Sequence, residues 1–320
     1  MTARTTLAIV YVRWSEQPGD APLSMLTDQI ARAGTTSTAV CVVDNRAGLP
    51  PVTTNAPRVA IAVGNNSARE FSGYDQGVRC LRAAGSSPDV WLLANDRLDA
   101  YGLDALALLS DHSLEVAATL PCALGQVDVW PGRVQLLGFD VSPWARSNLL
   151  LVPDHALRSV GSLVSIDARQ FGALVTESPP EPRAMRQPAR AFENLGETWS
   201  TLAAEWLTGT GSRLRSHWYK AAPIEPSTWP ELRAKAHSIV NEQLLSARLR
   251  RNGTPVLPLS LAATVGSLPS TGVRAITSAT IRRWPAAAAS VARTRGVGRV
   301  VRSCASVESS IRAGVRGVLG

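Results

Sequence analysis

The stretch that decides the fold is RVAIAVGNNSAREFSGYDQGVRCLRAAGSSPDVWLLANDRL, residues 58–98. It begins with a short apolar run at 58–63, continues with a helix-length amphipathic segment at 68–84, and ends with a second apolar run at 90–94. Strand-sized apolar runs that alternate with helix-sized amphipathic segments are typical of parallel strands joined by crossover helices. The stretch therefore predicts an α/β fold with a mainly parallel central sheet flanked by helices.

The same alternation extends to both sides of this stretch. We expect further strands at 7–14, 37–43 and 147–152, and further helices at 23–33, 154–160, 199–207 and 229–251. Two segments interrupt the pattern. Residues 127–130 and 134–137 are predicted to form a hairpin with Pro131-Gly132 as its turn, and the proline-rich segment 177–190 is predicted to be a loop or boundary.

The composition is that of a globular protein with a substantial core. Of the 320 residues, 45% are hydrophobic and 18% are charged, and the mean hydropathy is +0.03. These values exclude a disordered chain, and the length fits one large domain or two small ones. No uninterrupted apolar stretch reaches the roughly 18 to 20 residues that a membrane-spanning helix needs.

Two further features indicate the cellular setting. The opening segment MTARTTLAIVYVRW lacks the long apolar region and the small-residue cleavage site of a secretory signal. The cysteines are scattered without paired spacing, at Cys41, Cys80, Cys122 and Cys304. We therefore expect a reduced, cytoplasmic protein.

Polar residues follow successive predicted strands. They are Asp44, Asn65, Asn66, Asn95 and Asp96. In open α/β sheets, ligands bind outside the carboxyl ends of the strands, so these side chains are candidates for a binding site. The alternative is that Asn and Asp are simply the usual turn residues after strands.

Three stretches of the front half are informative together: VVDNRAG (42–48), VGNNSAREFSGYDQGVRCL (63–81) and DVWLLANDRL (89–98). They resemble the front half of family-2 glycosyltransferases of the GT-A fold. In that family an acidic residue after the second strand lies near the nucleotide base, and a later strand ends in a short acidic metal-binding motif. The resemblance implies a nucleotide-diphospho-sugar transferase fold, with a donor site formed by Asp44, Asn45, Asn65, Asn66, Tyr74, Asn95 and Asp96.

The back half resembles the same family. SNLLLVPDHALRSVGSLVSID (147–167) is similar to its acceptor-side strand and helix, and NEQLLSARLRRNGTPV (241–256) is similar to a helix start that carries the catalytic base. In this comparison Glu242 is the base. The resemblance implies a catalytic domain over 1–260, with an insertion near 168–235, followed by a basic helical extension over 261–320.

The resemblance implies a metal ligand at Asp96 and a catalytic base at Glu242, and the chemistry of sugar transfer uses both roles. The resemblance implies a divalent cation, Mg²⁺ or Mn²⁺, bound through Asp96, because such a cation neutralises the diphosphate of a nucleotide-sugar donor. Asn95 departs from a fully acidic motif and supplies no charge. Glu242 would take the proton from an acceptor hydroxyl, provided that the first turn of its helix points into the cleft. The alternative is an exposed charge that favours the helix dipole.

Aromatic and charged residues suggest an acceptor side. The candidates are Trp144, Arg146, Ser147, Trp218, Tyr219 and Lys220. An aromatic ring can stack on a sugar, and Lys220 could meet a phosphate. The alternative for Trp218 and Tyr219 is an ordinary, partly buried aromatic pair.

Positive charge is concentrated near the carboxyl terminus. The chain has 33 Lys and Arg against 25 Asp and Glu, which gives a net charge of +8 and a pI of about 10. Residues 281–320 hold eight arginines against Glu308 alone, a balance of +7 that leaves the first 280 residues at +1: Arg282, Arg283, Arg293, Arg295, Arg299, Arg302, Arg312 and Arg316. The general basicity is therefore a property of this tail.

The tail also has a helical apolar period. Its apolar residues recur at spacings of three and four: Val297, Val300, Val301, Cys304, Val307, Ile311, Val315 and Val318. A basic amphipathic helix can lie on an anionic membrane surface, here the inner face of the cytoplasmic membrane. The alternatives are a helix docked on the catalytic domain or a frayed tail.

The resemblance to family-2 glycosyltransferases implies an inverting hexosyl- or deoxyhexosyltransferase of bacterial polysaccharide assembly. It would move a sugar from a nucleotide-diphosphate donor to a hydroxyl of a glycan or lipid-linked glycan. One alternative is an inactive nucleotide-sugar-binding protein, suggested by Asn95. A second is a nucleic-acid-associated protein that acts through its tail. The four histidines have no metal-ligand spacing, and no nucleophile elbow or phosphate-binding loop motif is present.

Overall fold

The computed structural model describes most of the first 265 residues. The described residues are 5–14, 21–34, 38–46, 48, 58–178, 186–211, 214 and 217–265. The predicted amphipathic helix and membrane contact of residues 281–320 lie outside them. The boundary between a catalytic domain and a basic extension stays a prediction.

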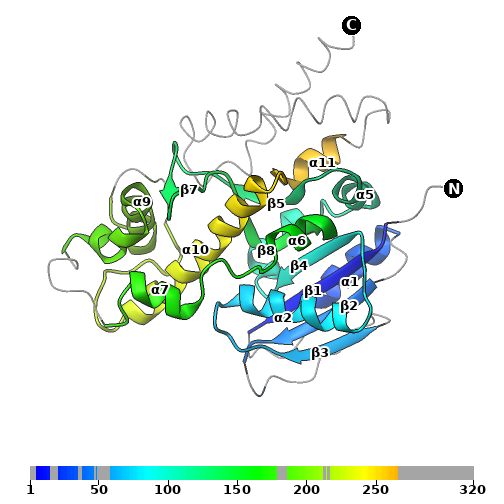
Figure 1. The fold of residues 1–320 in the computed structure, drawn as a ribbon, viewed down its shortest axis with the longest axis horizontal. Coiled ribbons are helices and arrows are strands. Elements are labelled where there is room, and N and C mark those ends of the chain that lie inside the picture. The colour runs from blue at the N-terminus through cyan, green and yellow to red at the C-terminus, as the bar shows by residue number, and fades with distance from the viewer. Residues whose placement is uncertain are drawn as a thin grey trace, which may run out of the picture.

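The centre of the molecule is a seven-stranded sheet (Figure 1). Its strands run in the order β3-β2-β1-β4-β8-β5-β9. β1, β2, β3 and β4 are mutually parallel, β8 is antiparallel to both of its neighbours, and β9 is parallel to β5. The bounds are β1 Leu7–Arg13, β2 Thr38–Asp44, β3 Val59–Val63, β4 Val90–Asn95, β5 Ala123–Asp128, β8 Trp144–Pro153 and β9 Val256–Pro258. The predicted α/β fold with a mainly parallel sheet flanked by helices is confirmed.

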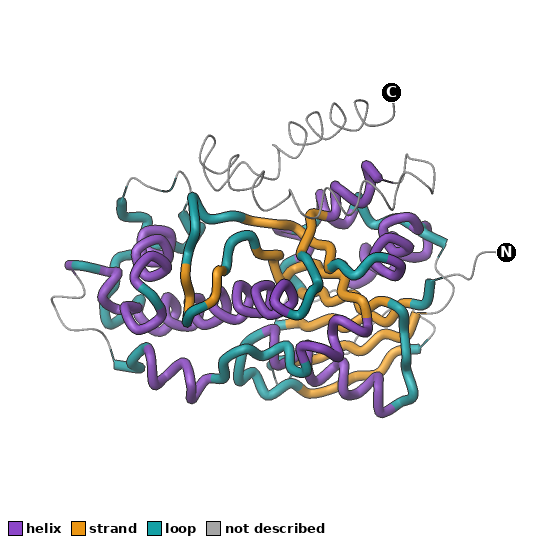
Figure 2. Tube along the Cα trace, turned by 45° about the horizontal axis from the view of Figure 1, so that its top comes forward, coloured by secondary structure: helices purple, strands orange, loops and turns teal. Residues whose placement is uncertain are grey.

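Helices cover the sheet and extend beyond it (Figures 1 and 2). Those near the sheet are α1 Ala21–Arg32, α2 Glu70–Ala83, α3 Leu98–Tyr101, α4 Leu103–Leu106, α5 Asp111–Thr119, α6 Asp154–Val160 and α11 Leu259–Val265. A second group lies to one side: α7 Ala168–Leu174, the 3₁₀ helix η1 Pro188–Leu195 and α9 Glu197–Thr208. The long helix α10, Trp229–Arg251, runs between the sheet and this group.

Helix α2 lies unusually close to the central strand β1. A Cβ atom on Gly77 would come 2.2 Å from Cγ1 of Val10, and one on Gly73 would come 2.8 Å from Cγ2 of Val12. Both distances are well below van der Waals contact, so only glycine fits at these two positions while the helix keeps its place. The close approach fixes the start of α2 against the carboxyl end of β1.

Two hydrophobic cores meet at α10. Leu245 and Leu249 near its end belong to the sheet core, whereas Leu232 and Ile239 belong to a second core with α7, η1 and α9. This second core is rich in tryptophan: Trp130, Trp144, Trp199, Trp218 and Trp229. Because α10 is buried by both cores, a polar residue near its middle is enclosed rather than exposed to solvent.

The predicted hairpin at 127–130 and 134–137 is wrong. β5 pairs with β8 instead, and the short hairpin joins β6, Gln135–Leu136, to β7, Phe139–Asp140. Its turn residues Leu137 and Gly138 have φ values of 49° and 79°. Positive φ at both central residues is what a type I′ hairpin turn requires, and Gly138 adopts it readily.

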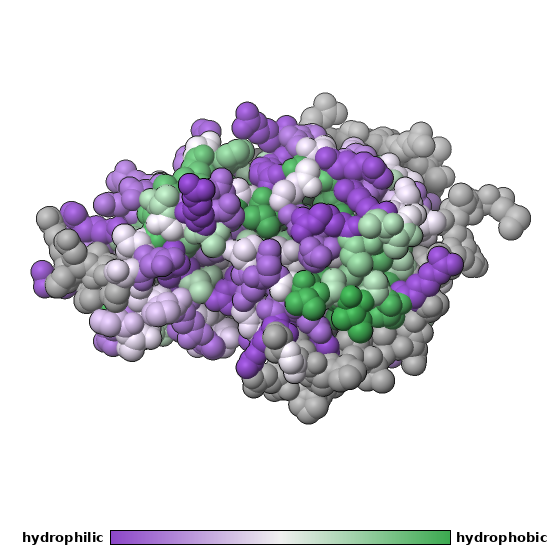
Figure 3. All heavy atoms as spheres, turned by 60° about the horizontal axis from the view of Figure 1, so that its bottom comes forward, coloured by the Kyte–Doolittle hydropathy of each residue, from purple (hydrophilic) through white to green (hydrophobic). Residues whose placement is uncertain are grey.

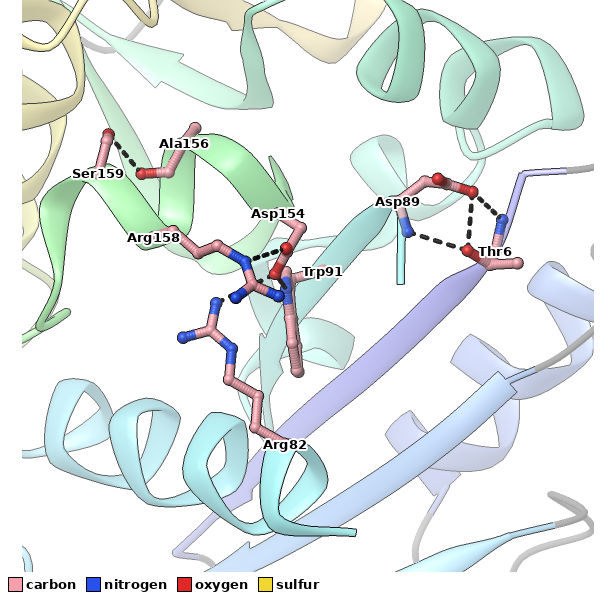
Figure 4. A network of polar contacts seen from close by, with 8 residues as sticks. All are labelled: Thr6, Arg82, Asp89, Trp91, Asp154, Ala156, Arg158 and Ser159. Atoms are coloured by element: carbon pink, nitrogen blue, oxygen red, sulfur yellow. Dashed lines mark hydrogen bonds and ion pairs between the residues drawn. The ribbon is translucent and has the colours of Figure 1, made fainter. Parts of the chain in front are cut away.

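A polar network closes the amino end of β4 (Figure 4). Asp154, which follows β8, accepts hydrogen bonds from Nε1 of Trp91 at 2.7 Å, Nη2 of Arg82 at 3.0 Å and Nε of Arg158 at 2.5 Å. Burial by itself would raise the pKa of Asp154, but the hydrogen bonds from Arg158, Trp91 and Arg82 outweigh it and lower the pKa. The network ties α2 and α6 to the sheet.

The outer edge strand β3 is the least covered part of the sheet. Its apolar side chains Val59, Ile61 and Val63 are 37%, 58% and 76% exposed. An apolar area is visible at the lower right of Figure 3, on the side where β3 lies in Figure 1.

Within the described part of the chain, no helix combines the length and the apolarity needed to cross a lipid bilayer.

Candidate active site

The order of the strands creates a switch point at the carboxyl end of the sheet. The chain passes from β1 outward to β2 and β3, and then returns to β4 on the other side of β1. In α/β proteins, ligands bind at the place where neighbouring connections leave in opposite directions, which here lies between the carboxyl ends of β1 and β4. The residues at these two ends are Trp14 and Asp96.

Asp96 is held at this switch point by two backbone contacts. Its Oδ2 accepts a hydrogen bond from the backbone N–H of Trp14 at 2.6 Å, and its own N–H donates to the carbonyl of Val12 at 3.1 Å. The neighbouring Asn95 is buried, and its Oδ1 accepts from the N–H of Arg97 at 3.1 Å. The half-buried Asp96 carboxylate is therefore the acidic group at the end of β4.

Asp96 could hold a metal ion only if a bound substrate supplied further ligands to that ion. Within the described segments, no group of three or more His, Cys, Asp and Glu side chains is arranged to hold a metal. Mg²⁺ is commonly bound through one or two carboxylates, with substrate phosphates and water as the remaining ligands. Asp96 fits that type of site.

Asp44, at the end of β2, forms an ion pair with Arg13. Arg13 donates from Nη2 to Oδ2 of Asp44 at 2.9 Å and from Nε to Oδ1. Both carboxylate oxygens thus have a guanidinium partner, so a nucleobase at Asp44 would share these oxygens with Arg13. The expected contact between Asp44 and a base stays a prediction.

Asn45 acts on the site through Arg69. Nδ2 of Asn45 and the hydroxyl of Ser72 donate to the carbonyl of Arg69 at 2.8 and 2.9 Å. Arg69 has φ 56° and ψ −137°, a conformation that costs a non-glycine residue on the order of 1–3 kcal/mol. Its guanidinium lies 5.0 Å from the centre of the Trp14 ring, which places a cation at the switch point.

Asn65 and Asn66 are exposed turn residues in the structure. Oδ1 of Asn65 accepts from the N–H and the hydroxyl of Ser67 at 3.0 and 2.9 Å, and Asn66 has a φ of 54°. These are the contacts of a turn that leads into α2. A donor-binding role for the two asparagines stays a prediction.

A second polar cluster lies where α2, β8 and α10 converge. Oε1 of Glu242 accepts from the N–H of Ser147 at 2.8 Å. Oε1 of Glu70 accepts from the hydroxyls of Ser147 and Ser238 at 2.9 and 2.8 Å. The hydroxyl of Tyr74 donates to the carbonyl of Ser147 at 2.6 Å. Ser147 therefore contacts three side chains of this cluster.

Glu242 does not lie at a helix start, so that expectation is wrong. Helix α10 runs from Trp229 to Arg251, as the pattern at 229–251 predicts, so Glu242 lies near its middle and not in its first turn. Its side chain is only 9% exposed. The alternative of an exposed charge that favours the helix dipole is therefore wrong as well.

The environment of Glu242 makes it a base suited to neutral pH. Burial raises the pKa of Glu242 to about 7; the charge of Lys235 and the N–H of Ser147 oppose this rise, while the charges of Glu70 and Asp128 add to it. A general base works best when its pKa lies near the working pH. Glu242 is thus a candidate for proton removal.

The predicted acceptor residues Trp144 and Arg146 have structural contacts. Trp144 is buried, with its ring centre 5.1 Å from that of Trp130. Arg146 forms a two-point ion pair with Asp128, at 2.7 and 3.1 Å. Of the residues 144–147, Ser147 is the one in direct contact with the acid cluster.

The segment around residue 218 contributes mainly to packing. Trp218 is buried and stacks on Trp206 with ring centres 6.4 Å apart, while Lys220 donates to Oε1 of Glu231 at 2.5 Å. Tyr219 is 59% exposed. Trp218 therefore matches the alternative of a buried aromatic, and Tyr219 is the ring of this segment that faces solvent.

Sequence reasoning missed Arg69 and Glu70. The two residues lie side by side at the start of the helical segment expected at 68–84, and Glu70 is the first residue of α2. An acidic residue in the first turn of a helix is common, so the pattern alone gave no reason to select it. The signal that was present is a charged pair at the junction between a strand-end turn and a helix.

Comparison with known proteins gives little to transfer. No protein-family model and no curated protein matches the chain. One similar solved structure is mannosyltransferase PcManGT from Pyrobaculum calidifontis in complex with GDP-Man and Mn²⁺, with 14% identity and a TM-score of 0.32 over 92% of this chain and 88% of that chain. At this TM-score the roles of residues in that protein cannot be assigned to positions in this one.

Proposed function

We propose that the protein is a glycosyltransferase that moves a sugar from a nucleotide-diphosphate donor to a hydroxyl of a glycan or lipid-linked glycan. The observation that carries the proposal is the setting of Glu242. A buried carboxylate with a pKa near 7 lies in the acid cluster formed by α2, β8 and α10. The residues that resemble family-2 glycosyltransferases support the same reading, because Glu242 falls on the position of their base.

The reaction is a single displacement at the anomeric carbon, which inverts its configuration. Glu242 takes the proton of the acceptor hydroxyl as its oxygen forms a bond to the anomeric carbon. The bond from that carbon to the diphosphate breaks at the same time, and the nucleoside diphosphate leaves with the electron pair. The proton remains on Glu242 until it passes to solvent.

The switch point binds the donor's diphosphate. Arg69 supplies a cation beside Trp14, and Asp96 would hold Mg²⁺ or Mn²⁺ together with the phosphates. When bound, the cation neutralises the charge that grows on the leaving diphosphate. The strained backbone of Arg69, held by Asn45 and Ser72, keeps its guanidinium at this place.

The second candidate is a protein that binds nucleotide sugars without transferring them. It is favoured by Asn95, which brings no charge to the end of β4 and whose Oδ1 is already bonded to the N–H of Arg97. Both candidates predict donor binding at the switch point. Only the transferase predicts that Glu242 is needed for turnover.

The test combines binding with turnover. Calorimetric titration of UDP and GDP, each with and without Mn²⁺, should show metal-dependent binding that Asp96→Asn weakens about tenfold or more, because an amide removes the charge but can still accept from Trp14. Asp99→Asn, three residues further on, is the matched control and should bind like the wild type. Release of nucleoside diphosphate from UDP- and GDP-sugars in the presence of glycan acceptors then measures transfer. Binding without any release would favour the second candidate, and no binding would reject both.

A further inference from the structure

Glu70 is a second carboxylate beside Glu242 that the proposed mechanism does not yet use. It is the first residue of α2 and is half-buried. Its position directly follows Arg69, whose unusual backbone is fixed by two hydrogen bonds. The direction in which the Glu70 side chain leaves α2 is therefore set by a rigid junction.

The contacts of Glu70 are those of a bridge between three elements. A single oxygen, Oε1, accepts from the hydroxyl of Ser147 on β8 at 2.9 Å and from that of Ser238 on α10 at 2.8 Å. Ser147 also donates its N–H to Glu242 at 2.8 Å. Ser147 thus has one acidic partner on its hydroxyl and another on its backbone, and Ser238 lies one helical turn before Glu242 on the same helix.

The helix dipole alone does not explain this arrangement. An acid in a first turn is favoured by the dipole wherever its side chain points, and Glu197 at the start of α9 shows that case with an exposed side chain. Glu70 is instead directed at two hydroxyl groups from other elements. Neither hydroxyl brings a positive charge, and the charge of Glu70 raises the pKa of Glu242.

The charges that face Glu242 come from several elements. Lys235 on α10 lowers the pKa of Glu242, whereas Glu70 on α2 and Asp128 on β5 raise it. Arg146 on β8 and Tyr74 on α2 also interact with Glu242, and Arg146 is paired with Asp128. Within this set, Glu70 is the acid that shares a hydrogen-bonding partner with Glu242.

We propose that Glu70 is a positioning residue for the transfer reaction: through Ser147 and Ser238 it fixes β8 and α10 around Glu242, and it holds a negative charge beside that base. This rests on the proposed function. Glu70 touches neither donor nor acceptor in this role. The removal of its charge should therefore change the pH at which the enzyme becomes active, and the removal of its contacts should change the rate.

The main experiment is the pH profile of kcat/KM for transfer. Activity requires ionised Glu242, so it rises with pH through the pKa of that residue. In Glu70→Gln the midpoint of this rise should fall by about one pH unit, because the neighbouring negative charge is removed. Glu70→Asp keeps the charge and should restore the wild-type midpoint. Glu197→Gln is the matched control, with an acid at the start of another helix, and should leave the profile unchanged.

A second variant keeps the proposal testable if Glu70→Gln does not fold. Ser238→Ala removes one hydroxyl from Glu70 but keeps every charge, so kcat should fall several-fold while the KM for the donor and the pH midpoint stay unchanged. A midpoint that Glu70→Gln leaves in place, or a kcat in Ser238→Ala equal to that of the wild type, would overturn the proposal.

A readout without turnover separates this proposal from the proposed function. The pKa of Glu242 also determines how the free energy of unfolding changes between about pH 4.5 and 7. If Glu70 acts on Glu242, denaturant titrations of Glu70→Gln should show that the decrease in the free energy of unfolding ends at a lower pH than in the wild type. This result would support the pairing of the two acids even in a protein that shows no transfer, and an unchanged pH range would count against it.

Discussion

Asp154 and Glu242 lie at opposite ends of the strands of one sheet, and their surroundings shift their pKa values in opposite directions. Asp154 at the amino end of β4 is bonded to two arginines and a tryptophan N–H, which lower its pKa. Glu242 lies at the other end of these strands, near the start of β8, where its hydrogen-bond donor is the N–H of Ser147 and Glu70 lies nearby. Burial raises its pKa to about 7.

At the amino end of β4 the carboxylate contributes to stability, whereas at the carboxyl end the carboxylate is suited to catalysis. The antiparallel direction of β8 makes both possible, because its start lies beside the carboxyl end of β4 and its end beside the amino end. A carboxylate that is ionised at every working pH can tie elements together. A carboxylate that exchanges a proton near pH 7 costs stability when ionised but can act as a base.

The largest expected effect is on turnover. Glu242→Gln removes the base while keeping the size of the side chain and an oxygen that accepts from Ser147. We expect kcat/KM for transfer to fall by roughly 10²- to 10⁴-fold, with donor affinity within about twofold of the wild type. Steady-state kinetics together with calorimetric donor titration measure both quantities. An unchanged kcat would reject Glu242 as the base.

The next effect is on stability and has a defined sign. A folded-state pKa of about 7, against an ordinary value of 4.5, means that the folded protein holds a proton that the unfolded chain has lost. The contribution of Glu242 to stability is therefore complete below pH 4.5 and is lost as pH rises to 7. The loss amounts to about 3 kcal/mol. Urea titrations of wild type and Glu242→Gln at pH 5 and 8 should show the loss only in the wild type, and equal pH dependence would contradict it.

A smaller effect with the opposite pH dependence is expected at the amino end of β4. Asp154→Asn leaves Arg82, Arg158 and Trp91 without their charged acceptor, so the free energy of unfolding at pH 7 should fall by roughly 2 kcal/mol. The lowered pKa means that Asp154 stabilises the fold above its ordinary pKa and that this contribution is lost as pH falls through the folded-state value. The variant should therefore approach the wild type in acid. A reduced kcat per folded molecule would show that the two ends of the strands are not independent.

The smallest effect is expected for Arg158. Its side chain is 56% exposed, and its ion pair with Asp154 lies four residues along one helix. Exposed pairs of this kind contribute about 0.3–0.5 kcal/mol. Arg158→Ala should therefore change the midpoint of urea unfolding only slightly, whereas Arg82→Ala, which also loses a cation–π contact with Trp91, should change it more. Equal decreases of the unfolding midpoint in Arg158→Ala and Arg82→Ala would show that the stabilisation by each arginine does not depend on how far it is buried.

Local patterns predicted the fold better than they predicted the site. The alternation at 58–98 was enough for β3, α2 and β4, because apolar period and turn residues are properties of neighbouring positions. β5 pairs with β8 across an intervening segment that contains the β6–β7 hairpin, and the local turn signal of Pro131-Gly132 does not reveal this pairing.

The candidate site shows the same limit. Glu242 was selected through resemblance, but its depth follows from packing on both sides of α10, which no local period reveals. Glu70 was not selected, because its significance lies in contacts with Ser147 and Ser238, 77 and 168 residues away.

The position of α10 has a consequence for how the molecule unfolds. The helix contributes side chains to the sheet core and to the tryptophan-rich core, so neither core is complete without it. Separating the two would break a continuous helix and expose apolar surface on both sides at once. The two cores are therefore expected to melt as one cooperative unit, and Glu242 lies in the segment that links them.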